Sequence, residues 1–341
     1  HRASGAHRDA DGSDVAVHGI RRDEFERYIV LASRSGIRVF DLDGAEKSVK
    51  MENSGPDYLA AATAPGRDFR FLTINDYTFV LNRRVTVKAS ETLSPKRPPE
   101  AIVFIKQASY NTTYTVTLDG RSVSFTTLDG VAPADEPADR LSSKEIAESL
   151  ADQLRTAPGT PYSVTYSNST VWIRRTDGGE FTIKVEDTRS NTHMTVCKGT
   201  VQRFSDLPTV APRGFVTEVV GDSSSSFDNY YCVFEPTDAR DDFGTGTWKE
   251  TVKPGIPCAL DASTMPHALV RQADGTFTFG PLEWDERTCG DDKSAPFPSF
   301  VNRAMGGLFF YRNRLAFLSG ENVVMSAVGE FFNFFLTTVT T

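Results

Sequence analysis

The stretch "TYTVTLDGRSVSFTT", residues 113–127, decides the fold class. Apolar and polar residues alternate on both sides of Asp119-Gly120, as they do in a strand with one buried face. An Asp-Gly pair suits a type I′ turn, because both central residues of that turn take positive φ angles. The stretch therefore predicts a β-hairpin. The same arrangement recurs three times and predicts a mainly β protein, with further hairpins around Asp43-Gly44, Asp177-Gly178 and Asp274-Gly275.

One helix is expected, over residues 142–156. Ser142 and Glu145 have the spacing of a capping box, and Ile146, Leu150 and Leu154 recur every four residues on one face. The helix lies between two of the expected hairpins. This order predicts a small α+β module over residues 99–205, in which the helix covers one face of a small sheet.

The segments on either side of this module consist of strand–turn–strand units with nearly continuous apolar runs, at 25–40, 69–84 and 308–326. A propeller blade and a β-sandwich both contain such units, and the pattern alone leaves both open. We predict three domains: N-terminal propeller-like blades at 1–98, the inserted α+β lobe at 99–205, and a β-rich return to the blades at 206–341.

The charge of the chain bears on its partners. The chain has 341 residues and a formal net charge of −8. Proteins that bind nucleic acid tightly neutralise its phosphates with a basic patch. The richest basic cluster in this sequence is Arg21 and Arg22, and acidic residues follow it directly: Asp23, Glu24 and Glu26. This pattern disfavours tight DNA binding and is compatible with DNA that slides past. No apolar run reaches the ~18 residues of a membrane helix.

The sequence holds no catalytic motif and no cofactor fingerprint, and no histidine has metal-binding spacing. We therefore expect neither enzyme activity nor a cofactor or metal. Asp238, Asp241 and Asp242 could bind a hard cation, but their position between two expected strands favours a solvated hairpin loop. The widely spaced cysteines predict buried free thiols at Cys197, Cys232, Cys258 and Cys289.

Several longer segments carry a family resemblance: "SGIRVFDLDGAEK" (35–47), "INDYTFVLNR" (74–83), "TMPHALVR" (264–271), "CGDD" (289–292) and "FFYRNRLAFLSGENVVMS" (309–326). In wording and order they resemble the tail tubular protein B family, the tail nozzle proteins of short-tailed, podovirus-type bacteriophages. The resemblance covers roughly residues 20 to 335 and is least in the α+β module.

The resemblance implies a structural subunit of the virion, assembled in the host cytoplasm. In the family, six subunits form a ring around the DNA ejection channel, below the tubular adaptor ring and in contact with tail fibres. The family fold is similar to an irregular β-propeller with inserted modules. Family members are longer than this chain, so the resemblance implies further blades after Thr341 and an incomplete propeller here.

Two groups of candidate site residues follow from the resemblance and the residues together. Tyr311, Phe317, Phe331 and Phe334 are candidates for packing between blades, and we expect them to be partly exposed in this chain. Asp238, Asp241 and Asp242 are candidates for a loop that faces the channel or the adaptor ring. Acidic residues concentrate around this loop and at a second place, in segments 222–250 and 129–155.

Two other functions stay open at this point. A tail-associated protein that binds or degrades glycans could stack sugars on Trp172, Trp248 and Trp284, although core packing is the simpler interpretation of these tryptophans. A secreted β-propeller receptor is disfavoured, because the cysteines suggest no disulfides.

Overall fold

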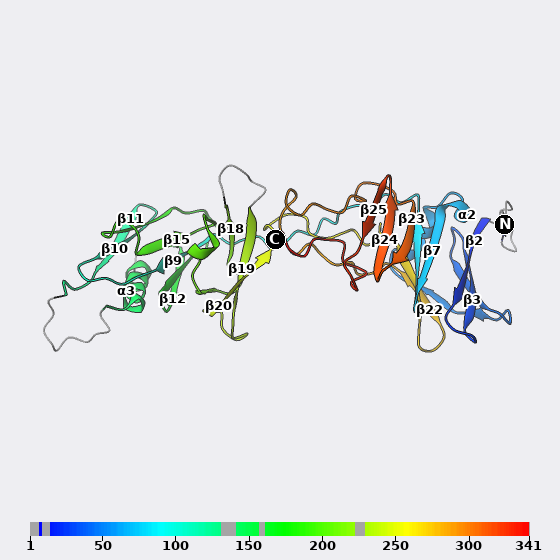
Figure 1. The fold of residues 1–341 in the computed structure, drawn as a ribbon, viewed down its shortest axis with the longest axis horizontal. Helices are drawn as coiled ribbons and strands as arrows, with labels where there is room; N and C mark the ends of the chain where they lie inside the picture. The colour runs from blue at the N-terminus through cyan, green and yellow to red at the C-terminus, as the bar shows by residue number, and fades with distance from the viewer. Residues whose placement is uncertain (1–6, 9–13, 131–140, 157–160, 222–228, 341) are drawn as a thin grey trace. The chain divides into compact units, whose positions relative to one another are not determined.

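The structure is a computed structural model that describes residues 7–8, 14–130, 141–156, 161–221 and 229–340. Its contacts divide the chain into two compact units, each of which is described by itself. Unit 1 comprises His1–Leu93, Pro257–Arg287 and Pro296–Thr337; unit 2 comprises Ser94–Ile256, Thr288–Ala295 and Thr338–Thr341. Both consist mainly of β-sheets (Figure 1), as the sequence predicts.

Unit 1 contains three sheets, named here in chain order. The first sheet has the order β1 (His7–Arg8), β2 (Asp14–Arg21), β3 (Arg27–Ala32), β4 (Ile37–Asp41) and β5 (Glu46–Lys47). The middle sheet has the order β6 (Val49–Met51), β22 (Phe277–Gly280), β21 (His267–Arg271), β8 (Tyr77–Asn82) and β7 (Phe69–Ile74). The third sheet has the order β23 (Gly307–Tyr311), β24 (Arg314–Ser319) and β25 (Asn322–Met325).

The middle sheet is buried on both faces. Successive residues of β8 point to opposite faces of the sheet. Val80 therefore enters the core shared with the first sheet, whereas Phe79 and Leu81 enter the core shared with the third. The three sheets thus stack face to face with a separate hydrophobic core in each gap (Figure 1).

Two short helices, α1 (Gly55–Ala60) and α2 (Pro65–Asp68), connect β6 to β7 in unit 1. Tyr58 of α1 is buried, and its hydroxyl accepts a hydrogen bond of 2.8 Å from the Asn82 backbone N–H. Its ring stacks on His267 at a centroid distance of 4.0 Å. His267 is fully buried, with Ser54 Oγ 3.0 Å from Nε2 and the Met265 carbonyl oxygen 2.9 Å from Nδ1. These contacts fix α1 to the end of the middle sheet.

Unit 2 also contains three sheets. One has the order β11 (Arg121–Thr126), β10 (Thr113–Leu118) and β14 (Ile183–Asp187). The next has the order β12 (Tyr162–Ser167), β13 (Thr170–Arg175), β9 (Glu100–Ile105) and β15 (Met194–Cys197). The last has the order β16 (Thr200–Val201), β18 (Val216–Val219), β19 (Tyr230–Pro236), β20 (Phe243–Thr251) and β17 (Val210–Pro212), and a 3-10 turn, η2, spans Phe204–Asp206.

The expected helix is present as α3 (Ser143–Arg155), and the Ser142 side chain accepts a 3.0 Å hydrogen bond from the Glu145 backbone N–H. The expectation of one small sheet beneath it is wrong, because α3 shares its core with two sheets. Gln153 donates to the Ser124 carbonyl oxygen of β11 (3.0 Å), and Arg155 donates to the Val164 carbonyl oxygen of β12 (2.8 Å). The helix thereby covers the edge strands of both sheets.

Three of the four predicted hairpins are confirmed. Asp119 and Gly120 both have positive φ angles, as a type I′ turn requires, and Leu118 pairs with Arg121. The pairs β4–β5 and β21–β22 are also antiparallel. The hairpin around Asp177-Gly178 is wrong: β13 pairs with β12 and β9, whereas β14 pairs with β10 in another sheet. Partners distant in sequence override the local turn here.

Residues 206–256, which the sequence groups with the C-terminal region, lie in unit 2. The division into three domains is a prediction about which parts fold independently, and it stays a prediction: 1–98, 99–205 and 206–341. The four cysteines are buried and free, as predicted. Across the described residues, no helix has both the length and the apolar character needed to cross a membrane.

The first prediction concerns the core beneath α3. Leu150 is fully buried in it, so Leu150→Ala should lower the free energy of unfolding by about 2–5 kcal/mol. Lys144→Ala, at an exposed position of the same helix, should change it by less than about 0.5 kcal/mol. Chemical denaturation of both variants measures the difference. Equal midpoints for the two variants would show that the burial of this helix face is misread.

The second prediction concerns acid. Burial lowers the pKa of His267 to about 4, although its bond to the Met265 carbonyl opposes this, and burial also lowers the pKa of His18. The unfolded chain therefore binds these protons first, and stability is lost as pH falls from about 6.5 toward 4. His267 alone should account for roughly 3 kcal/mol.

Thermal melts across this pH range measure the loss. His267→Gln should start from a lower stability at neutral pH and lose less on acidification. A His267→Gln variant with an unchanged pH dependence would contradict the assignment.

Candidate functional site

The acidic loop predicted at Asp238, Asp241 and Asp242 connects β19 to β20 and is exposed. The Arg213 guanidinium donates to the backbone carbonyl oxygens of Asp238 (3.0 Å) and Asp241 (2.9 Å), not to the carboxylates. The Asp238 carboxylate accepts a 2.9 Å bond from the Arg240 backbone N–H. The backbone is therefore held in place while three carboxylates face solvent, with two arginines beside them.

The segment forms the hairpin connection between two antiparallel strands, as expected, and its three carboxylates are exposed in this chain. Among the described residues, no three His, Cys, Asp or Glu side chains gather as they would around a metal ion. The remaining acidic residues of the two acidic segments lie partly outside the described residues: Asp135, Glu136, Asp139, Asp222 and Asp228.

The aromatic candidates occupy three different environments in unit 1. Phe317 and Phe334 are buried in the core between the middle and third sheets and stack on each other at 4.9 Å. Phe331 is half-buried and meets Phe310 edge to face at 5.3 Å. Tyr311 is 51% exposed. The expected partial exposure is therefore wrong for Phe317 and Phe334, because the middle sheet already covers them.

Trp284 packs as a core residue, as the simpler interpretation holds, whereas Trp172 and Trp248 are half-buried against a hydrophobic cluster. Trp284 is buried against Phe317 and Phe334. The indole N–H groups of Trp172 and Trp248 donate to the Glu100 carboxylate (2.8 Å) and the Pro208 carbonyl oxygen (2.7 Å). Burial raises the pKa of Glu100, and the bond from Trp172 opposes that shift.

The outer faces of the first and third sheets carry exposed apolar residues among charged ones, such as Arg38 and Arg314. In β3, Ile29 lies between the buried Tyr28 and Val30 and points away from the core, beside Phe40 of β4. On the third sheet the same alternation turns one row of residues outward. This row includes Arg314, the buried Ala316 and five larger apolar residues, of which all except Phe309 are exposed: Phe309, Tyr311, Leu318, Val323 and Met325.

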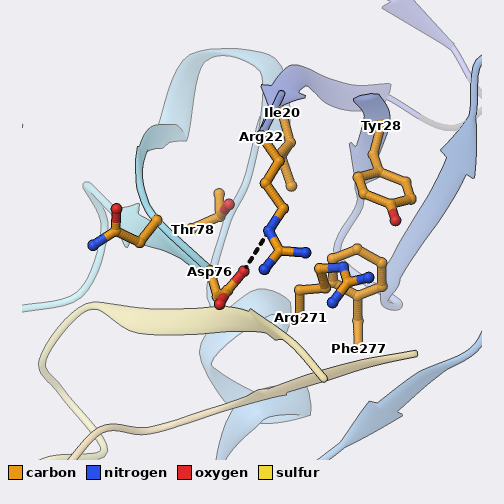
Figure 2. A pocket seen from close by; sticks show the side chains of 8 residues that line it. Ile20, Arg22, Tyr28, Asp76, Thr78, Arg271 and Phe277 are labelled. Carbon is orange, nitrogen blue, oxygen red and sulfur yellow. Dashed lines mark ion pairs between the residues drawn. The ribbon is translucent and has the colours of Figure 1, made fainter. Parts of the chain in front are cut away.

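An ionic network joins the β2–β3 loop to the middle sheet. Figure 2 shows its Arg22–Asp76 pair, with Arg271 nearby. Arg22 contacts Glu26 at 2.5 Å and Asp76 at 3.0 Å, and Arg271 of β21 also contacts Glu26. Tyr28 donates to the same Glu26 carboxylate at 2.9 Å. The bonds from Arg22, then Tyr28 and Arg271, hold the pKa of Glu26 below its usual value against the effect of burial.

This network is balanced, with two guanidinium groups and two carboxylates. It encloses a cavity of only about 10 Å³, enough for roughly one water molecule. We therefore regard it as a structural link between two sheets rather than a ligand site. The sequence placed Arg22 beside Glu26, but the approach of Asp76 and Arg271 depends on strands that are distant in sequence.

Comparisons with known proteins identify similar chains. The family model described as "Bacteriophage nozzle protein" matches residues 2–341. The chain is also 36% identical over 331 residues to "Tail tubular protein gp12" of Escherichia phage T7. This match covers 95% of the chain and 40% of the relative, so the chain spans less than half of that relative's length.

The third prediction concerns the ionic network. Arg271→Ala removes a partner of Glu26 from a partly buried site, so it should lower the free energy of unfolding by about 1–3 kcal/mol. Hydrogen exchange should become faster in the loop 22–26. Lys50→Ala, which breaks an exposed pair with Glu52, should cost less than about 1 kcal/mol. Unchanged exchange in that loop would show that Arg271 does not hold it.

Proposed function

Because the chain belongs to the bacteriophage nozzle protein family and is a structural component of the virion tail, we propose that it forms a hexameric ring around the DNA ejection channel. In this proposal the ring contacts the tubular adaptor protein and the tail fibre protein. Double-stranded DNA passes through it without sequence-specific binding, and the chain has no enzymatic role.

The stacked sheets of unit 1 support a propeller-like architecture. Face-to-face sheets with apolar residues in every gap are the packing of consecutive propeller blades. The outer faces of the first and third sheets also carry exposed apolar residues, and exposed apolar surface on a soluble protein marks contact sites. We propose that further blades, encoded in the part of a full-length protein that this chain does not span, cover these two faces. Tyr311 would then join Phe317, Phe331 and Phe334 in packing between blades.

The overall charge supports a conduit that DNA can pass. Duplex DNA carries one negative charge per ~1.7 Å of its axis, so a strongly basic wall would retain it. A net charge of −8 on each subunit instead repels the phosphates. The exposed carboxylates of Asp238, Asp241 and Asp242 suit either the channel wall or the interface with the adaptor ring.

Glycan binding or cleavage is the alternative function, and the described residues favour it less. Of its expected stacking residues, Trp284 is buried in a hydrophobic cluster, and Trp172 and Trp248 are partly buried against another. A sugar platform needs exposed aromatic faces that are free to stack.

The fourth prediction tests the proposed function by native mass spectrometry of the full-length protein. A complex of six subunits is expected, because a heterologous contact that closes on itself gives a ring. A monomer that releases reducing sugar from bacterial polysaccharide would overturn the proposal in favour of the glycan-directed alternative.

A further inference from the structure

Folding assembles a cluster of arginines that are separated in the sequence. The arginine cluster comprises Arg67 of α2, Arg70 of β7, and Arg83 and Arg84, which follow β8. Antiparallel pairing of Phe69 with Asn82 brings the two pairs together. The side chains of Arg70 (3.0 Å) and Arg83 (3.4 Å) both donate from Nη1 to the Arg67 carbonyl oxygen. Two guanidinium groups therefore converge on one backbone oxygen.

Carboxylates neutralise only part of this charge. Asp68 is buried and pairs with Arg84 at 3.2 Å, while its other carboxylate oxygen accepts the backbone N–H groups of Thr63 and Ala64. Asp14 lies near the helix, where Oδ2 is 3.4 Å from the Gly66 backbone nitrogen. Within the part of the chain that the structure describes, no ion pair involves Arg67, Arg70 or Arg83.

The arrangement differs from that of arginines scattered over a solvated surface. Convergence of like charges costs electrostatic energy, and the backbone bonds of Arg70 and Arg83 hold their groups in place nonetheless. Arg70 Nη1 also donates to the Phe69 carbonyl oxygen at 2.7 Å. A guanidinium held in this way loses less conformational freedom when it binds an oxyanion, and its planar fork fits a phosphate with two parallel bonds.

We propose that Arg67, Arg70 and Arg83 contact the phosphodiester backbone of duplex DNA that passes the nozzle. This inference rests on the proposed conduit, which brings phosphates to the protein, and it assigns the place where an otherwise acidic subunit touches them. With three arginines per subunit, the contact is sequence-independent and weak enough to be broken as the DNA moves.

Arginines also bind carboxylates, so an acidic protein surface is the other class of partner to consider. On this chain the exposed acidic loop at 238–242 is accompanied by Arg213 and Arg240. Its charge is therefore partly balanced, which makes it a poorer partner than a phosphate backbone. Duplex DNA carries no such balancing cations except mobile counterions, and their release favours binding.

The fifth prediction measures binding of the full-length protein to a short fluorescent duplex of random sequence across a range of salt concentrations. Arg67→Gln with Arg83→Gln should weaken binding equally on all sequences. It should also lower the magnitude of the slope of log K against log salt by about 1–2, since each lost phosphate contact removes about 0.9. The pair Arg67→Lys with Arg83→Lys should keep the slope and bind several-fold more weakly, because it retains charge without the planar fork.

Arg121→Gln with Lys144→Gln is the matched control, because it removes two exposed cations from unit 2. The control should bind as the wild type does. An equal loss in the control would reduce the effect to net charge and overturn the proposal. Wild-type DNA binding by the arginine double variant would also overturn it, and loss of the ring in that variant would then assign the cluster to an acidic protein surface.

The two proposals fail separately. A wild-type protein that forms no sixfold complex contradicts the ring, and its DNA binding is still measured in the same assay. Both arginine variants leave the Arg84–Asp68 pair intact, so they should fold. Melting temperatures equal to that of the wild type would show that they do.

Discussion

Unit 1 depends on a five-stranded sheet that is apolar on both faces. Neither face of the middle sheet can remain in water, because Val80 of β8 contributes to one core and Phe79 and Leu81 contribute to the other. The first sheet covers one face and the third sheet covers the other, although their strands come from opposite ends of the chain. The outer faces of these two covering sheets also expose apolar residues, among them Ile29 and Leu318. In a stack of this kind, the last sheet needs either a polar outer face or a further partner that covers its apolar residues.

Local signals in the sequence predicted the elements well where short-range chemistry determines them. Asp119-Gly120 predicted a hairpin because its turn needs two positive φ angles, and Ser142 predicted the start of α3 because it caps a backbone N–H. The nearly continuous apolar run at 69–84 predicted only part of a blade or a sandwich, and it fits the burial of β8 on both faces. The hairpin predicted around Asp177-Gly178 was wrong because the neighbours of β13 and β14 in their sheets come from distant segments. Local turn and strand propensities do not show which distant strand a segment will pair with.

The functional surfaces were less predictable for a related reason. Phe317 and Phe334 were expected to be partly exposed, because sequence alone did not show that the middle sheet would cover them. The arginine cluster escaped notice because its members are separated in the chain. The signal existed, since the predicted strand–turn–strand unit at 69–84 places Arg70 and Arg83 at one end of a hairpin. Pairing an expected hairpin residue by residue would have found it.

We propose that the outer face of the third sheet is covered in the complete protein. Met325 lies on that face and is 38% exposed in this chain, whereas Met305 is 3% exposed. Oxidation of the native full-length protein, with each methionine quantified by mass spectrometry against the unfolded protein, measures this directly. The account predicts that Met325 is protected as strongly as Met305. Rapid oxidation of Met325, with Met305 still protected, would contradict it.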